Sequence, residues 1–203
     1  APVVARDVHV QARAALAPHC RLTPVWPLTG PAPGLDVPLL LKCENLQLTG
    51  SFKVRGALNF VRQLDDAAAG RGLIAMSAGN HAQGVALAGA ARGIPVTIVM
   101  PESAPLAKVN ATRALGARVV IHGAALDDAR AEAQSIAASE GRIFVPPFDD
   151  DAVIAGQGTV GLELLDQAPD VEEVLVPAGG GGLLAGIAVA VKSLRPDVRV
   201  VGV

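Results

Sequence analysis

Lys53 is the residue of this chain with the clearest potential for chemistry. It lies in the segment 49–56, at the start of a predicted helix, where the helix dipole does not favour a cation and Arg55 adds like charge. A lysine amine whose pKa is lowered by burial or by a nearby positive charge becomes nucleophilic near neutral pH and can form a Schiff base with an aldehyde. Lys53 is therefore the candidate nucleophile, although a solvated surface lysine fits the same pattern.

Four consecutive glycines, Gly179–Gly182, separate the apolar run Val174–Val176 from a helical segment that starts at Leu183. Backbone amides without side chains can approach a phosphate closely in such a turn, and the positive end of the helix dipole adds to the attraction. A flexible loop is the alternative. The same turn satisfies a loose dinucleotide fingerprint that ends at Ala185, so a nucleotide-binding oxidoreductase stays as a rival hypothesis.

A second strand-to-helix turn has the sequence Ser77-Ala78-Gly79-Asn80-His81. Its backbone amides and small polar side chains are suited to holding a carboxylate. Helix capping explains Ser77 and Asn80 equally well, and packing explains His81. This turn is the candidate substrate-carboxylate site.

Strands and helices alternate from about residue 37 onward, as is typical of βαβ units around a parallel sheet. The strands, mostly apolar throughout as if buried on both faces, are predicted at 37–42, 73–77, 95–100, 118–122, 142–145, 173–176 and 198–203. Helices are predicted at 52–64, 81–92, 105–115, 125–140, 159–167 and 183–194, with a surface loop at 27–38. The three candidate segments thus each lie where a predicted helix begins.

Composition excludes several classes of protein. With 203 residues, 51% of them hydrophobic and 18% charged, the chain has enough apolar material for a globular core. A net charge of −2 without a basic stripe argues against nucleic-acid binding, and the longest apolar runs are too short to span a bilayer. Cys20 and Cys43 form neither a disulfide framework nor a metal motif. We expect a cytoplasmic protein without a metal site or a membrane partner.

The motifs together resemble the β-family, or fold-type II, of pyridoxal-phosphate (PLP) enzymes, and most closely its threonine/serine dehydratase (ammonia-lyase) branch. Residues 42–45 and 51–56 resemble the lysine motif, 77–84 the asparagine loop and 179–183 the phosphate cup. Residues 148–150, 153–159 and 161–163 are also similar to that branch. The resemblance runs from about Thr23 to the end of the chain.

The resemblance implies a role for each candidate residue. Lys53 would carry PLP and act as general base, Phe52 would lie beside the cofactor ring, and Asn80 would bond its phenolic oxygen. The implied cofactor-binding residues are Phe52, Lys53, Asn80, Gly179, Gly180, Gly181, Gly182 and Leu183. The implied substrate-binding residues are Ser77, Ala78, Gly79, Asn80 and His81.

The implied reaction is the dehydration and deamination of L-threonine or L-serine to a 2-oxo acid and ammonia. Val54 and His81 favour this branch, because related sulfhydrylases and threonine synthases carry an aspartate and a threonine or alanine there. Ala78 stands where serine racemases have a second acid/base serine, which argues against racemisation. A serine racemase, a hydroxyaspartate dehydratase and an inactive PLP-binding homologue are the alternatives.

The implied architecture is a three-layer α/β fold of the tryptophan synthase β type. Residues 1–58 and 146–203 would belong to a large domain and residues 59–145 to a small one. Family members continue past the apolar strand at 198–203, so we expect a chain truncated at its C-terminus that lacks the partner of the pyridine nitrogen and retains PLP weakly. The full-length protein is expected to form a homo-oligomer, a dimer or a tetramer.

Overall fold

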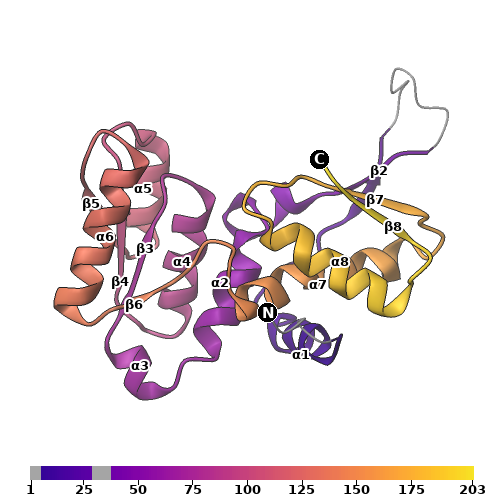
Figure 1. Ribbon diagram of the computed structural model, residues 1–203, viewed down its shortest axis with the longest axis horizontal. Helices are drawn as coiled ribbons and strands as arrows, with labels where there is room; N and C mark the ends of the chain where they lie inside the picture. The colour runs from indigo at the N-terminus through magenta and orange to yellow at the C-terminus, as the bar shows by residue number, and fades with distance from the viewer. Residues whose placement is uncertain (1–5, 29–37) are drawn as a thin grey trace.

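The structure, a computed structural model, describes residues 6–28 and 38–203, and its elements form two lobes (Figure 1). The first lobe is built on a parallel sheet with the strand order β5-β4-β3-β6. Its strands are β3 (Leu73–Met76), β4 (Val96–Met100), β5 (Arg118–Ile121) and β6 (Ile143–Phe144). Its helices are α3 (Asp66–Gly70), α4 (Asn80–Ala91), α5 (Leu106–Ala114) and α6 (Leu126–Glu140).

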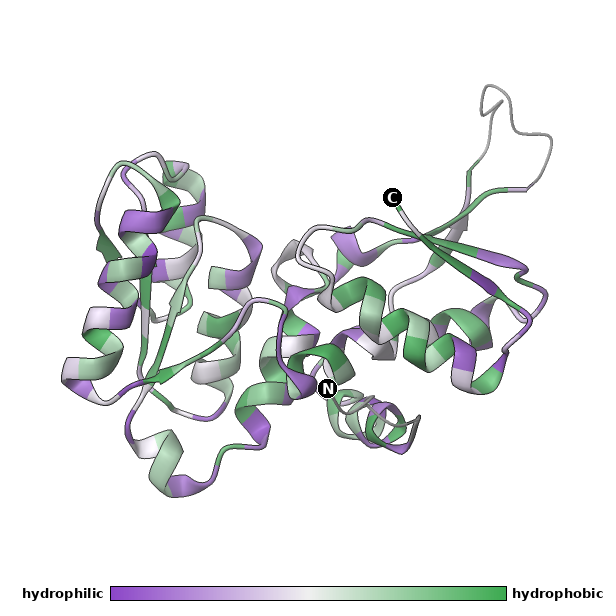
Figure 2. Cartoon of the chain, viewed as in Figure 1, coloured by the Kyte–Doolittle hydropathy of each residue, from purple (hydrophilic) through white to green (hydrophobic). Residues whose placement is uncertain are grey.

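Helices cover both faces of this sheet, which makes three layers. All five residues of β4 are buried, and the strands at the centre of the sheet are mostly apolar (Figure 2). Because side chains alternate along a strand, Ile74 and Val99 pack against α6, whereas Leu73 and Ile98 pack in the core that α4 covers. The predicted three-layer α/β fold is confirmed.

The second lobe contains helices α7 and α8 and two short sheets. Its elements are α1 (Arg6–Leu16), β1 (Val25–Pro27), β2 (Leu40–Lys42), α7 (Asp151–Gln167), β7 (Glu173–Val176), α8 (Gly182–Leu194) and β8 (Arg199–Gly202). Strands β7 and β8 pair in parallel, and β1 pairs with β2 in antiparallel fashion. Helix α2 (Lys53–Arg62) lies between the lobes, after two 3₁₀ turns at Glu44–Leu46 and Leu48–Gly50 (Figure 1).

The prediction that the strands are buried on both faces is wrong for β7 and β2 in the second lobe. In β7, Val174 and Val176 are buried but Leu175 is exposed, so this strand is not buried on both faces. Strand β2 is largely exposed and pairs with β1, which the apolar pattern did not predict. Residues 29–37, with most of the predicted surface loop, lie outside the described residues.

Helix α7 begins at Asp151, eight residues before the predicted start. The Asp150 side chain caps it by accepting hydrogen bonds from the backbone N–H groups of Ala152 and Val153. Gly156 and Gly158 disfavour helix locally, but both are needed for packing here: a Cβ on Gly156 would lie 2.6 Å from the Arg55 carbonyl oxygen. Close packing between helices therefore overrides local propensity. Helices α1 and α3 were likewise not predicted.

The order of the strands brings particular loops together. The chain adds β4 and then β5 on one side of β3, and β6 returns to the other side. Loops that follow neighbouring strands diverge at such a switch point, which is where ligands bind in open α/β sheets. Residues 77–80 follow β3, and residues 145–150 follow β6. In the described part of the chain, no helix is long and apolar enough to cross a membrane.

Candidate active site

Lys53 is the first residue of α2 and lines a cavity of about 250 Å³. Its Nζ donates a hydrogen bond to the Pro147 carbonyl oxygen at 2.7 Å and lies 5.4 Å from the centroid of the Phe52 ring. Burial lowers the pKa of the Lys53 amine, because water no longer stabilises the charged form. The side chain therefore has the environment of a nucleophile or base, as expected from the sequence.

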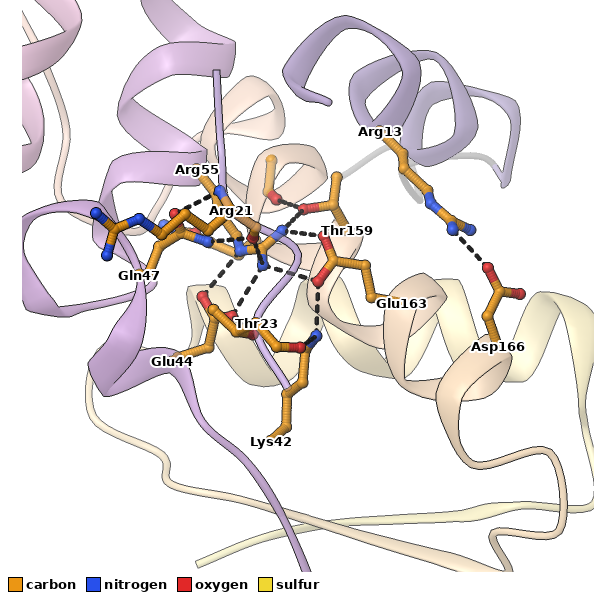
Figure 3. Close-up of polar contacts among 12 residues, drawn as sticks. Arg13, Arg21, Thr23, Lys42, Glu44, Gln47, Arg55, Thr159, Glu163 and Asp166 are labelled. Atoms are coloured by element: carbon orange, nitrogen blue, oxygen red, sulfur yellow. Dashed lines mark hydrogen bonds and ion pairs between the residues drawn. The ribbon is translucent and has the colours of Figure 1, made fainter. Parts of the chain in front are cut away.

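The expected electrostatic effect of Arg55 on Lys53 is wrong. Residues two positions apart do not face each other on a helix. Arg55 instead turns into a buried cluster of charges, where Glu44 and Glu163 pair with its guanidinium (Figure 3). Burial, and not the neighbouring arginine, lowers the pKa of Lys53.

The glycine turn Gly179–Gly182 lines the same cavity as Lys53. Helix α8 starts at Gly182, so the first amides of α8 lack acceptors within the helix and are available to an anion. Gly181 has φ of +87°, a conformation that other residues rarely adopt. The structure thus brings together two segments that are more than a hundred residues apart in sequence: an amine and an anion-binding turn.

Gly180 leaves no room for a side chain, because a Cβ there would lie 2.2 Å from Cδ1 of the Phe148 ring. We expect Gly180→Ala to lower the free energy of unfolding by about 1–3 kcal/mol through overpacking. Gly179→Ala is the matched control: nothing lies within 4 Å of its Cβ position, so its effect stays within about 0.5 kcal/mol. Urea denaturation without added cofactor measures both. Equal effects would show that contact with Phe148 does not restrict this turn.

The Ser77–His81 turn, the predicted substrate-carboxylate site, is not among the residues that line this cavity. The Ser77 hydroxyl accepts a hydrogen bond from the Gly79 N–H, and Asn80 Oδ1 accepts one from Lys108 Nζ at 2.9 Å. Because an ammonium group only donates, the NH₂ end of the Asn80 amide is directed away from Lys108. The segment 145–147 joins the two places, since His81 Nε2 lies 3.0 Å from the Val145 carbonyl oxygen and Lys53 binds the carbonyl two residues later.

His81 is buried, and burial lowers its pKa to about 4, against the opposing effect of its hydrogen bond to Val145; the charge of Lys53 also lowers it. The ring is therefore neutral at pH 7 and donates Nε2–H to the carbonyl. A substrate carboxylate held here must rely on neutral donors, not on an imidazolium.

This lowered pKa predicts a pH dependence of stability. The unfolded state, with a histidine pKa near 6.5, binds more protons than the native state between pH 6.5 and 4. The free energy of unfolding should therefore fall with acidification through this window, by roughly 3 kcal/mol from His81 alone. Urea denaturation at several pH values, compared with His81→Leu, measures the contribution. An identical pH dependence in the variant would contradict it.

Sequence reasoning did not assign a role to several residues that line the cavity, namely Pro147, Phe148, Gln157 and Pro177. Gln157 comes from α7, and its Oε1 accepts a hydrogen bond from the backbone N–H of Gly56 at 3.2 Å. This hydrogen bond joins the side chain of a residue in α7 to the backbone of α2. The glycines on either side of Gln157 were the available signal, because Gly156 allows close approach of α7 to α2 and Gly158 allows close approach to α1 and α8. Both cysteines are free, and in the described residues no cluster of three potential metal ligands occurs.

The model of a protein family described as "pyridoxal-phosphate dependent enzyme" matches residues 16–203. The chain belongs to this family. An L-threonine ammonia-lyase of Thermotoga maritima is 56% identical over 165 residues, which cover 81% of this chain and 41% of that protein. A catabolic L-threonine dehydratase of Escherichia coli K12 is 55% identical over 165 residues, which cover 81% of this chain and 50% of that protein.

Solved structures of the same fold include a maize serine racemase, with a TM-score of 0.95 and 36% identity over 99% of this chain and 61% of that one. A threonine deaminase of Solanum lycopersicum has a TM-score of 0.90 and 38% identity, and the match covers 97% of this chain and 58% of that one. The chain spans about half the length of the curated relatives it matches. These matches confirm the predicted family and leave the dinucleotide-binding alternative without support.

The residues around the cavity fit the functional groups of PLP. The cofactor of this family carries an aldehyde and a phosphate. Lys53 offers an amine of lowered pKa for the aldehyde, and the glycine turn at the start of α8 offers amides for the phosphate. Both line one cavity, with Phe52 beside the amine.

Proposed function

We propose that this protein is a PLP-dependent ammonia-lyase that acts on L-threonine or L-serine and produces a 2-oxo acid and ammonia. One observation carries the proposal: the Lys53 amine, whose pKa is lowered by burial, shares a cavity with the glycine turn Gly179–Gly182. The names of the relatives at 55–56% identity support the reaction and the choice of substrate.

Each candidate residue has a distinct task in this proposal. Bound PLP supplies an aldehyde for the amine and an electron sink for the reacting amino acid. Lys53, once its amine is free and neutral, removes the proton from Cα of the substrate. The protonated lysine can then return this proton to the departing β-hydroxyl. Loss of water gives an enamine, and its hydrolysis consumes that water and releases ammonia with the 2-oxo acid.

The two turns bind and orient in this proposal. Gly179, Gly180, Gly181, Gly182 and Leu183 hold the phosphate through backbone amides, as expected for the start of α8. The Ser77–His81 turn holds the substrate carboxylate, and the Asn80 amide, oriented by Lys108, donates its N–H to the cofactor's phenolic oxygen. The Phe52 ring lies against the Lys53 amine and limits access of water to it.

Racemisation of serine is the second candidate, because the maize serine racemase is similar in fold. Racemisation needs a proton donor on the face of Cα opposite to Lys53. Ala78, in the proposed carboxylate-binding turn, has a methyl group that cannot donate a proton. We therefore expect elimination to exceed racemisation with L-serine, which a chiral assay for D-serine alongside pyruvate would measure.

The proposal is tested by borohydride reduction of the purified full-length protein with PLP, followed by peptide mapping. We expect a phosphopyridoxyl adduct on Lys53, together with formation of a 2-oxo acid from L-threonine, L-serine or 3-hydroxyaspartate. An adduct on another lysine would refute the site, and an adduct on Lys53 without any turnover would indicate an inactive homologue.

The four-stranded sheet with its own helices supports a small domain at 59–145, although α2 crosses its first boundary. Homo-oligomerisation and cytoplasmic location stay predictions.

A further inference from the structure

Arg55 is held by two bidentate ion pairs in a buried cluster (Figure 3). Its Nε and Nη2 each donate to one oxygen of Glu44 at 2.8 Å. Its Nη1 and Nη2 donate to the two oxygens of Glu163 at 2.6 and 2.9 Å, and Nη1 also reaches Thr159 Oγ1 at 3.2 Å. The planar guanidinium is thus fixed in position and in rotation, which a single hydrogen bond could not achieve.

The two carboxylates are themselves anchored. Glu44 Oε1 accepts a hydrogen bond from the Thr23 hydroxyl at 2.6 Å, and Glu163 Oε2 accepts one from Lys42 Nζ at 2.7 Å. The Lys42 ammonium also donates to the Thr23 carbonyl and to Gln167. The cluster of Lys42, Glu44, Arg55 and Glu163 therefore balances two cations with two anions and connects β2 and α7 to α2.

Arg55 and Lys53 point to opposite sides of the first turn of α2. Residues two positions apart in an α-helix are separated by about 200° around the helix axis. Lys53 lines the 250 Å³ cavity with the glycine turn, whereas Arg55 lines a separate cavity of about 160 Å³ that also contacts Leu16 and Cys20. Any rotation of this turn that moves Arg55 also moves Lys53.

Helix α7 holds the same turn of α2 on the cavity side. Gln157 accepts a hydrogen bond from the Gly56 N–H, and Gly156 packs directly against the Arg55 backbone. With Glu163 also on α7, contacts from this one helix lie on both sides of the turn that carries Lys53. The Gln157 and Gly156 contacts hold one side of the turn, and the pair of Glu163 with the Arg55 side chain holds the other, so the rotation of the turn depends on both sets of contacts.

We propose that Arg55 is a positioning residue for Lys53: its bidentate pairs with Glu44 and Glu163 set the rotation of the first turn of α2 and so the placement of the Lys53 amine in the cavity. The inference rests on the proposed role of Lys53. It assigns an indirect effect on the reacting amine, through the rotation of this turn, to a side chain that does not line the Lys53 cavity.

Arg55→Lys tests this inference, because lysine keeps the positive charge but cannot form two bidentate pairs. Arg92→Lys is the matched control: Arg92 Nη1 donates to the carbonyl oxygens of Val61 and Leu64, at the far end of α2. Three quantities are compared in the full-length protein: the pH midpoint of the visible absorption of bound PLP, kcat and KM for L-threonine, and the unfolding midpoint without PLP.

We expect Arg55→Lys to lower kcat by roughly 10- to 100-fold, since small misplacement of a reacting group has effects of this size. KM should stay within about threefold of wild type, because the substrate-binding turn is not altered. The pH midpoint of the PLP absorption should shift by more than about half a pH unit, since the surroundings of the amine change. Arg92→Lys should lower the unfolding midpoint but leave kcat and the absorption midpoint unchanged.

Either of two results would overturn the inference: wild-type kcat and absorption midpoint in Arg55→Lys, or equal changes in both variants. If Arg55→Lys does not fold, Glu44→Gln replaces it, because the amide keeps one acceptor oxygen and loses one bidentate pair. Wild-type values of both quantities in a folded Glu44→Gln would also overturn the inference. Failure of the proposed function is distinguished by the wild-type protein, which would then give no borohydride adduct on Lys53.

Discussion

Lys53→Ala should lower turnover of L-threonine by at least about 10⁴-fold, because in the proposed reaction one amine provides both the attachment of the cofactor and the general base. The borohydride adduct should disappear as well. The protein should remain folded, because the loss of the hydrogen bond to the Pro147 carbonyl oxygen is offset by removal of a buried amine whose charged form burial disfavours. Peptide mapping and a coupled assay for the 2-oxo acid measure both effects.

Lys192→Ala is the matched control for this variant. Lys192 also donates from Nζ to a proline carbonyl oxygen, that of Pro196 at 3.0 Å, but it is exposed near the end of α8. Its removal should change neither the adduct nor kcat. Turnover by Lys53→Ala within tenfold of wild type would contradict the assignment of Lys53 as the base.

Glu163→Ala should cause the largest loss of stability among the variants considered. The side chain is buried and compensates two cations, Arg55 and Lys42, which would both lose a charged partner. Removing one partner of a buried ion pair costs about 3–5 kcal/mol, because an uncompensated charge is left away from water. Urea denaturation of the protein without PLP measures this loss.

Asp166→Ala provides the comparison on the same helix. Asp166 pairs with Arg13 at an exposed position, and such pairs contribute less than about 1 kcal/mol. A loss for Glu163→Ala no greater than that for Asp166→Ala would show that the buried cluster does not stabilise the fold.

Acid should reduce the contribution of Glu163. Burial alone would raise the pKa of this carboxyl, but hydrogen bonds and charge from Arg55 and Lys42 outweigh it and lower the pKa below its usual value. A carboxyl with a lowered folded-state pKa stabilises the fold above its unfolded pKa and loses that effect as pH falls through the folded value. The difference in stability between wild type and Glu163→Ala should therefore shrink at low pH.

Local sequence patterns determined much of the fold and the identity of the candidate residues. The apolar runs of β3 and β4 predicted central strands, and the glycines at 93, 116 and 141, all with positive φ, followed the ends of predicted helices. Lys53 at the start of α2 and Gly179–Gly182 before α8 were also located correctly. These features depend on residues within one or two turns of each other, so the sequence alone carries them.

Tertiary structure alone decided which groups face each other. Lys53 meets the Pro147 carbonyl across 94 residues, and Arg55 pairs with Glu163 across 108. For that reason the sequence suggested that Arg55 repels Lys53, whereas the folded chain neutralises Arg55 with two distant carboxylates. The start of α7 was missed for the same reason, since Gly156 and Gly158 are accommodated in a helix by close packing against α2 and against α1 and α8, respectively. Burial and charge pairing depend on distance in space, and only the folded chain sets that distance.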